Sequence, residues 1–208
     1  CVTRRQRQMC IRDRLFFDQY KKQDKNNIFL INLGNPKHKL SWQKTYLLVN
    51  HLSNQISKDI KLGDRCVLIS ENRPEWLISD LAIMLAGGIS VPSYTTYTTK
   101  DYEYIIKDCE PSVLIVSNNT QFNKIKDILD YKKIKKIISF DRLENLKFQN
   151  YLCIEDIINK KDGFENFDSE ISLKRSDPAC IIYTSGTQGN PKGVILSHGG
   201  ILLSLIHI

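Results

Sequence analysis

Short continuous apolar runs along the chain predict the strands of a buried sheet. Most runs are bounded by glycine, proline, serine, threonine or charged residues, which is typical of strands that end in turns. Gly34, Asn35 and Pro36 follow the first run and predict a turn, and Pro92 is expected to end the third strand. The strands are predicted at residues 28–32, 66–70, 89–91, 113–116, 136–139, 180–183 and 194–196.

Segments with helical spacing of apolar residues lie between these runs. Ser41 is placed to cap a helix over residues 42–60. Asn72 is placed to cap a second helix, with Glu75 three residues later reaching back to it, and the glycine pair at 87–88 should end that helix after about residue 85. Further helices are predicted at residues 99–108 and 121–129, with a short helix near 151–158 in the irregular stretch 141–175.

Strands that alternate with helices of about ten to fifteen residues are typical of a mostly parallel α/β sheet with flanking helices. The chain has 208 residues, of which 41% are hydrophobic, and this is enough to bury one core. Asp80 interrupts the longest apolar candidate, residues 77–91, so no run reaches the roughly 20 residues of a membrane-spanning helix. We therefore predict the α/β class without a transmembrane segment.

The six cysteines form no CxxC pair and no regular framework. Neither a zinc site nor a disulfide scaffold is therefore expected. Cys66, Cys109, Cys153 and Cys180 lie beside apolar residues and are predicted to be inert members of the core. This usage favours a reducing compartment, and we expect a cytoplasmic location.

Both ends of the chain differ in composition from the remainder. Residues 1–14 hold five arginines against one aspartate, whereas the following chain prefers lysine. Residues 9–14 back-translate to ATG TGT ATA AGA GAC AG, and the reverse complement of that string encodes residues 203–208. We therefore expect 1–14 and 203–208 to be translated sequencing adapters and 15–202 to be an internal or N-terminal piece of a longer protein. A basic arm or targeting presequence is the alternative for the first segment.

The formal charge of +7 falls to +3 when residues 1–14 and 203–208 are set aside. Most of the electrostatic argument for a nucleic-acid partner disappears with them. Lysines are frequent between residues 124 and 136, but Asp127 and Asp130 lie among them. A nucleic-acid stripe would need aromatic or arginine stacking partners as well. We predict a solvated helix face there and no nucleic-acid partner.

Hydroxyl-bearing residues and glycines cluster between the last two predicted strands. Residues 183–193 read Tyr-Thr-Ser-Gly-Thr-Gln-Gly-Asn-Pro-Lys-Gly, which provides backbone N–H groups, side-chain donors and one mobile positive charge. This chemistry suits a polyphosphate. A Walker A loop is excluded, because Lys192 lies between Pro191 and Gly193 and a strand follows where that motif needs a helix. An ordinary hairpin turn is the alternative for the Asn-Pro-Lys-Gly part alone.

The complete string resembles the phosphate-loop signature of the adenylate-forming superfamily, Tyr-Thr-Ser-Gly-Thr-x-Gly-x-Pro-Lys-Gly, which acyl-CoA synthetases, luciferases and peptide-synthetase adenylation domains share. Gln188 departs from the family's usual Ser or Thr and keeps a polar donor. Residues 63–96, with an Asn-Arg-Pro-Glu-Trp helix start and a Val-Pro exit, are similar to the N-terminal region of long-chain fatty acyl-CoA synthetases. By this resemblance, residues 15–202 are the truncated N-terminal portion of an AMP-binding large domain.

The resemblance implies an enzyme that activates a fatty acid with Mg-ATP to an acyl-adenylate and passes the acyl group to coenzyme A. Fatty acid, ATP and coenzyme A are the implied partners. The Mg²⁺ ligands are expected after residue 202, and peripheral association with a membrane is compatible with such an activity. Lys192 and Thr184 are the implied catalytic residues. The residues implied to hold the β and γ phosphates are Thr184, Ser185, Gly186, Thr187, Gln188, Gly189 and Lys192.

Two other functions stay open at this point. One is activation of a different carboxylate by the same chemistry, and the other is a non-catalytic module that binds nucleotide phosphates. His198 is a further residue with two interpretations, a catalytic acid or base and a helix-start residue. Its position between Ser197 and Gly199 favours the helix start.

Overall fold

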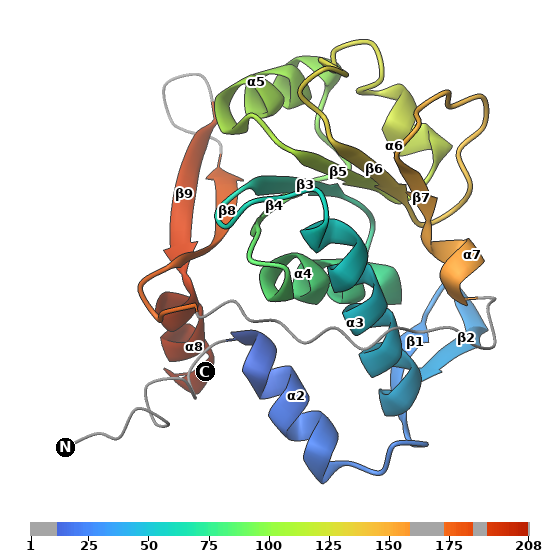
Figure 1. Cartoon of the computed structure of the whole chain (residues 1–208), viewed down its shortest axis with the longest axis vertical. Helices are drawn as coiled ribbons and strands as arrows, with labels where there is room; N and C mark the ends of the chain where they lie inside the picture. The colour runs from blue at the N-terminus through green and yellow to red at the C-terminus, as the bar shows by residue number, and fades with distance from the viewer. Residues whose placement is uncertain (1–11, 159–172, 185–190, 208) are drawn as a thin grey trace.

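The computed structural model describes residues 12–158, 173–184 and 191–207. Its centre is a seven-stranded sheet in the order β7-β6-β5-β3-β4-β8-β9, with helices on both faces, and a two-stranded sheet, β1-β2, packs against α3 and α4 (Figure 1). The strands are β1 (Ile28–Asn32), β2 (Asn35–Ser41), β3 (Arg65–Ile69), β4 (Ile89–Ser93), β5 (Val113–Val116), β6 (Lys136–Ser139), β7 (Tyr151–Cys153), β8 (Pro178–Thr184) and β9 (Lys192–Ser197). The helices are α2 (Arg12–Lys22), α3 (Trp42–Ser57), α4 (Pro74–Leu85), α5 (Thr99–Cys109), α6 (Asn119–Asn123), α7 (Ile154–Ile158) and α8 (His198–His207).

Neighbouring strands of the large sheet run parallel from β7 to β8, and β9 runs antiparallel to β8. Helices α4, α5 and α6 connect the successive parallel strands β3, β4, β5 and β6. The predicted mostly parallel α/β fold with flanking helices is therefore confirmed. Within the described residues, no helix combines the length and the apolar character needed to cross a bilayer.

Alternate side chains of the central strands enter two separate cores. In β3, Cys66 and Leu68 face the core shared with α3 and α4, whereas Val67 and Ile69 face the core shared with α5. All four side chains are fully buried. Burial on both faces explains why these strands read as continuous apolar runs rather than as an alternating pattern. Cys66, Cys109, Cys153 and Cys180 are buried, which confirms their predicted place in the core.

The start of α3 agrees with the sequence prediction and the start of α4 differs. Ser41 caps α3 by accepting a hydrogen bond from a backbone N–H of the first turn at 3.2 Å. The N-cap of α4 is Arg73, without a side-chain cap, so the prediction that Asn72 caps this helix is wrong. The Glu75 carboxylate instead lies 3.3 Å from Arg73 Nε and 3.6 Å from His38 Nδ1. Pro74 suits this start, because the first helical position needs no N–H donor.

The glycine pair ends α4 as predicted. Gly87 has a φ of 82°, in the left-handed region that favours glycine. Gly88 is confined by packing, because a Cβ there would lie 3.1 Å from side-chain carbons of Ile60 and Ile83. The chain thus leaves the helix and enters β4 with little free space beside its backbone.

Two strands include a proline that the sequence placed in a turn or at a strand end. The turn is at Leu33 and Gly34, and β2 already contains Asn35 and Pro36, so the prediction that these two residues lie in the turn is wrong. A two-stranded sheet tolerates Pro36 because each strand has one unpaired side. β4 continues through Pro92, so the prediction that this residue ends the strand is wrong. The registered pair between β4 and β8 is Ser90 with Cys180, so the missing N–H of Pro92 interrupts no ladder on that side.

The regular helix predicted over residues 121–129 is wrong, because α6 ends at Asn123 and turns follow. Phe122, Ile125 and Leu129 still enter the core. Backbone bonds that span three residues, such as Ile125 N to Phe122 O, make this stretch tighter than an α-helix. In this segment the helical spacing of apolar residues therefore marks which side chains are buried, although the backbone forms turns.

The lysines of residues 124–136 are not all on a solvated face. Lys136 is 4% exposed and its Nζ lies 2.5 Å from Asp59 Oδ2. Lys124 Nζ donates to the carbonyl of Thr95 at 2.5 Å. Beyond them, Tyr151–Cys153 forms a strand that the sequence did not reveal, and the predicted short helix follows it as α7.

Candidate active site

The candidate phosphate loop joins the last parallel strand to the antiparallel edge strand. Thr184 ends β8 and Lys192 begins β9, and the two residues are partners in the antiparallel register. Both are exposed. The structure therefore brings together the first and last residues predicted for the site. The others, Ser185, Gly186, Thr187, Gln188 and Gly189, lie outside the described residues.

The base of the loop is closely packed at Gly193. A Cβ at this position would lie 3.0 Å from Cγ2 of Ile181 and 3.2 Å from Cζ of Tyr183, both on the neighbouring strand β8. These distances are tight, so a Cβ at this position would fit only if the two side chains or β9 shifted by a few tenths of an ångström. Glycine therefore suits the close packing of β9 on β8 beside Lys192.

Tyr183 anchors the end of β8 immediately before the loop. Its side chain is 2% exposed, and its hydroxyl lies 2.5 Å from Asp108 Oδ2 of α5. Burial, and then the hydrogen bond to this carboxylate, raise the pKa of the Tyr183 phenol, so the hydroxyl stays protonated and continues to donate. Tyr97 Oη in turn donates to the carbonyl oxygen of Tyr183 at 3.1 Å. Two contacts therefore fix the residue before Thr184.

An aromatic cluster on the connection between β4 and α5 holds Tyr97 in place. The ring of Tyr97 makes edge-on contacts with Tyr94, at 5.4 Å between centroids, and with Tyr102, at 5.9 Å. The hydroxyl of Tyr102 donates to the carbonyl of Tyr94 at 2.6 Å. The ring contacts and the hydrogen bond from Tyr102 therefore hold the β4–α5 connection in place. Tyr94 itself is 63% exposed.

The sequence prediction did not include Tyr97 or Asp108 in the site. They lie 86 and 75 residues before Tyr183 in the chain, and only the parallel packing of β4 beside β8 brings them near the loop. His198 begins α8 and is fully buried, as its interpretation as a helix-start residue expects. Within the described residues, no group of three or more His, Cys, Asp or Glu side chains is arranged to hold a metal ion.

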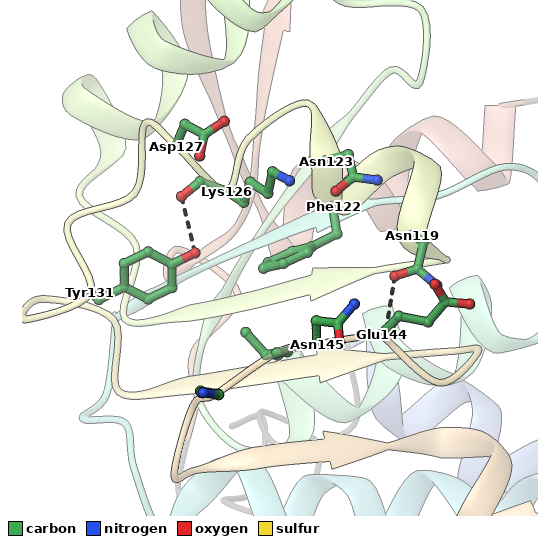
Figure 2. Close-up of a pocket in the computed structure, with 10 residues that line it drawn as sticks. Asn119, Phe122, Asn123, Lys126, Asp127, Tyr131, Glu144 and Asn145 are labelled. Carbon is green, nitrogen blue, oxygen red and sulfur yellow. Dashed lines mark hydrogen bonds between the residues drawn. The ribbon is translucent and has the colours of Figure 1, made fainter.

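A cavity of about 470 Å³ lies beside α6, away from the β8–β9 connection (Figure 2). The Asn119 side chain accepts from the Glu144 backbone N–H at 3.0 Å, and Tyr131 Oη donates to the Lys126 carbonyl at 3.0 Å. Its lining includes two lysines and two carboxylates, so it offers a polyphosphate no excess of positive charge. None of the residues at the base of the candidate phosphate loop lines this cavity. The nucleotide-binding interpretation therefore stays with the β8–β9 connection.

Solved enzymes share the mostly parallel α/β fold of this chain. The anthranilate CoA ligase AuaEII has the same fold, with a TM-score of 0.71 and 23% identity over 88% of this chain and 34% of that chain. The luciferase-like enzyme of the mealworm Zophobas morio gives 0.74 and 18% identity, over 92% of this chain and 44% of that chain. At these identities the likeness shows the fold alone.

The chain belongs to the family of AMP-binding enzymes, because the model of that family matches residues 16–208. A similar relative is the long-chain-fatty-acid–CoA ligase ACSBG2 of Xenopus laevis, 33% identical over 81% of this chain. Another is the long-chain-fatty-acid–CoA ligase ACSBG1 of Rattus norvegicus, 30% identical over 78% of this chain. The matched region covers 23% of the length of each of these two relatives.

Proposed function

We propose that this chain is part of an enzyme that activates a fatty acid with ATP and passes the acyl group to coenzyme A. The observation that carries the proposal is the paired position of Thr184 and Lys192 at the base of the Tyr-Thr-Ser-Gly-Thr loop, in a chain of the AMP-binding family. The names of the similar relatives supply the fatty acid and the coenzyme A. The reaction forms an acyl-adenylate and pyrophosphate, and then an acyl thioester and AMP.

The residues at the base of the loop fit a polyphosphate. Thr184 presents a hydroxyl and Lys192 an ammonium group from adjacent, exposed positions, and Gly193 leaves the backbone bare beside them. We assign Lys192 the role of offsetting negative charge on the departing pyrophosphate, and Thr184 that of donating a hydrogen bond to a phosphate oxygen. Preorganised donors of this kind act most strongly where charge develops in the transition state. Ser185, Gly186, Thr187, Gln188 and Gly189 complete the proposed phosphate contacts.

The proposed reaction also needs a metal ion, and within the described residues no His, Cys, Asp or Glu cluster is arranged to hold one. We propose that carboxylate ligands after residue 202 would hold Mg²⁺, which would offset phosphate charge when ATP is bound. Residues 15–202 are proposed to be the N-terminal portion of the large domain, and residues 1–14 and 203–208 to be translated sequencing adapters. Long-read sequencing of the source DNA tests this division. Recovery of residues 1–14 as genomic codons in frame with Leu15 would overturn it.

We further propose a cytoplasmic location with peripheral association with a membrane. The buried thiols of the described residues support a reducing compartment. A fatty acid substrate is itself an amphiphile that partitions into membranes, which supports an enzyme that works at a membrane surface.

The proposed activity is tested by pyrophosphate exchange in the complete enzyme that contains this chain. Labelled pyrophosphate should enter ATP only when magnesium and a fatty acid are both present, and a panel of aromatic, short-chain and long-chain carboxylates identifies the preferred substrate. Exchange with the long-chain acids is the expected result. Exchange that requires an aromatic or a short-chain acid would replace the proposed substrate, and nucleotide binding without any exchange would indicate a non-catalytic module.

A further inference from the structure

The hairpin formed by β1 and β2 exposes aliphatic side chains at and near its tip. Leu33 at the tip is 90% exposed and Ile31 near it is 48% exposed, whereas Ile28, which is 50% exposed, lies at the open end of the hairpin opposite Ser41. Single exposed apolar residues are common on protein surfaces. Two at the tip of a hairpin that lies apart from the large sheet (Figure 1) form a small exposed apolar surface.

The exposure of Leu33 is built into the turn. The Asn32 side-chain oxygen accepts hydrogen bonds from the backbone N–H groups of Gly34, at 3.0 Å, and Asn35, at 3.3 Å. These bonds hold Leu33 at the tip, where its side chain points away from the core and meets solvent. The aliphatic group is therefore presented by a defined turn.

Positive charge accompanies these aliphatic side chains. Lys39 is the register partner of Ile31 across the hairpin, and both residues are exposed. Lys37 is also exposed, and His38 lies between the two lysines. Residues 28–41 contain no aspartate or glutamate. Lys37 lines a groove that also contains the carboxylates of Glu75, Asp141 and Glu155, so Lys39, opposite Ile31, is the cation that accompanies the aliphatic tip.

The apolar surface continues from the hairpin onto the start of α4. A shallow groove of about 220 Å³ separates the two elements, and Leu30, Pro74, Trp76 and Leu77 provide most of its apolar wall beyond the hairpin tip. Arg73 lines the same groove, but its guanidinium donates to both carboxylate oxygens of Asp141 and lies 3.3 Å from Glu75 Oε2, so it adds little net positive charge. Tryptophan beside aliphatic groups is typical of the boundary between lipid headgroups and acyl chains.

We propose that the hairpin tip, with Leu33 and Ile31, inserts into the surface of a bilayer that contains anionic lipid, while Lys39 contacts a headgroup phosphate. Aliphatic side chains gain free energy by entering the acyl boundary, and lysines gain it near an anionic surface. The inference rests on the membrane association proposed above and assigns it to one surface. It does not depend on which carboxylate the enzyme activates.

Vesicle sedimentation tests the proposal with the full chain. The probes are large unilamellar vesicles of phosphatidylcholine alone and of phosphatidylcholine with phosphatidylserine. We expect binding to the anionic vesicles, loss of at least about tenfold in the partition coefficient with Leu33→Asp, and a smaller loss with Lys39→Glu. Leu62, which is 65% exposed before β3, supplies the matched control, because Leu62→Asp makes the same change away from the hairpin.

Several results would overturn the proposal. They are failure of the wild-type chain to bind anionic vesicles, equal binding to vesicles of phosphatidylcholine alone, and equal losses with Leu33→Asp and Leu62→Asp. A dimer in the absence of vesicles that Leu33→Asp dissociates would identify the hairpin as an interface between copies and would also overturn it. Pyrophosphate exchange by the complete enzyme, measured without vesicles, distinguishes the membrane proposal from the enzymatic proposal. Leu33→Asp in the complete enzyme should retain exchange at the wild-type rate. If the enzymatic proposal is wrong, the wild-type enzyme shows no exchange either.

Discussion

The hydroxyl of Tyr97 donates a hydrogen bond to the carbonyl oxygen of Tyr183, 3.1 Å away, and so connects the segment between β4 and α5 to the last buried residue before the candidate phosphate loop. The Asp108 carboxylate holds the side chain of the same tyrosine. Because both contacts come from the β4–α5 region, the position of Thr184 depends on residues that are remote in sequence. The loop is thus supported by the sheet and by α5 together.

Replacing Tyr97 by phenylalanine should weaken the support of the loop without disrupting the core. The ring stays in the aromatic cluster, while the carbonyl of Tyr183 loses one hydrogen bond. Such a bond contributes about 1 kcal/mol to the free energy of unfolding. In the complete enzyme we expect kcat for pyrophosphate exchange to fall roughly tenfold through misplacement of the loop. Tyr94→Phe is the matched control, and an equal fall in both variants would contradict a specific role for Tyr97.

Gly193→Ala should destabilise the pairing of β8 and β9. The new methyl group would lie 3.0 Å from Ile181 Cγ2, so β9 must shift or the neighbours must move. Overpacking of this kind typically costs about 1–3 kcal/mol in the free energy of unfolding. Gly200→Ala is the control, since its Cβ would meet Ser197 Oγ at an ordinary 3.4 Å within α8. Urea denaturation compares the two, and a Gly193→Ala chain as stable as the wild type would show that the strands yield freely.

Two adjacent lysines should differ strongly in their contribution to stability. Lys136 Nζ is buried against Asp59 Oδ2 at 2.5 Å and also donates to the Gln55 carbonyl at 2.8 Å. Lys136→Met removes both contacts of a nearly buried ammonium group and leaves Asp59, which is 22% exposed and still accepts from Asn150 Nδ2, without its cation. The free energy of unfolding should fall by about 2 kcal/mol. Lys135→Met removes an exposed pair with Asp64 and should cost less than about 1 kcal/mol. Equal effects in denaturant titrations would show that burial does not distinguish the two pairs.

The buried thiols should be unreactive while the chain is folded. Burial raises the pKa of Cys109 to about 12 and that of Cys66 further still, from the ordinary value of 9.0. The reactive thiolate is therefore scarce in the folded state at pH 8. The same sign makes the stabilising contribution of Cys109 complete below pH 9 and progressively lost as the pH rises from about 9 towards about 12.

Labelling with Ellman's reagent measures this in a chain that carries Cys1→Ser and Cys10→Ser. We expect negligible reaction at pH 8 until guanidinium exposes the remaining thiols. Native-state labelling at the rate of the unfolded chain would contradict the burial of these residues. A thermal midpoint that rises between pH 9 and pH 11 would contradict the sign of the stability change.

The sequence predicted most of the fold because its strands bury both faces and its longer helices carry regular apolar spacing. It failed where polarity or tertiary contacts decided the outcome. β2 contains Pro36, Lys37 and Lys39 and lies exposed, so no apolar run marks it. The segment after α6 keeps its apolar residues buried in turns, a geometry that produces the same spacing as a helix.

Only part of the candidate site could be predicted from the sequence, because the remainder depends on tertiary contacts. Thr184 and Lys192 lie within one contiguous motif, which composition and spacing reveal. Tyr97 and Asp108 act through contacts with Tyr183 that exist only after β4 and β8 pair in the sheet. Nothing in the local pattern around either residue indicates that contact, so only the three-dimensional arrangement identifies them.

The most direct test of the account is pyrophosphate exchange by Lys192→Ala in the complete enzyme. Lys192 is an exposed residue at the start of an edge strand, so its removal should leave the fold intact. Loss of one preorganised electrostatic contact typically slows the chemical step by about a hundredfold or more. We expect a decrease of that size in kcat, with the wild-type rate retained by Lys132→Ala, which changes an exposed lysine in the turns before β6. Exchange at the wild-type rate by Lys192→Ala would show that this lysine belongs only to a turn and would contradict the assignment of the loop to phosphate chemistry.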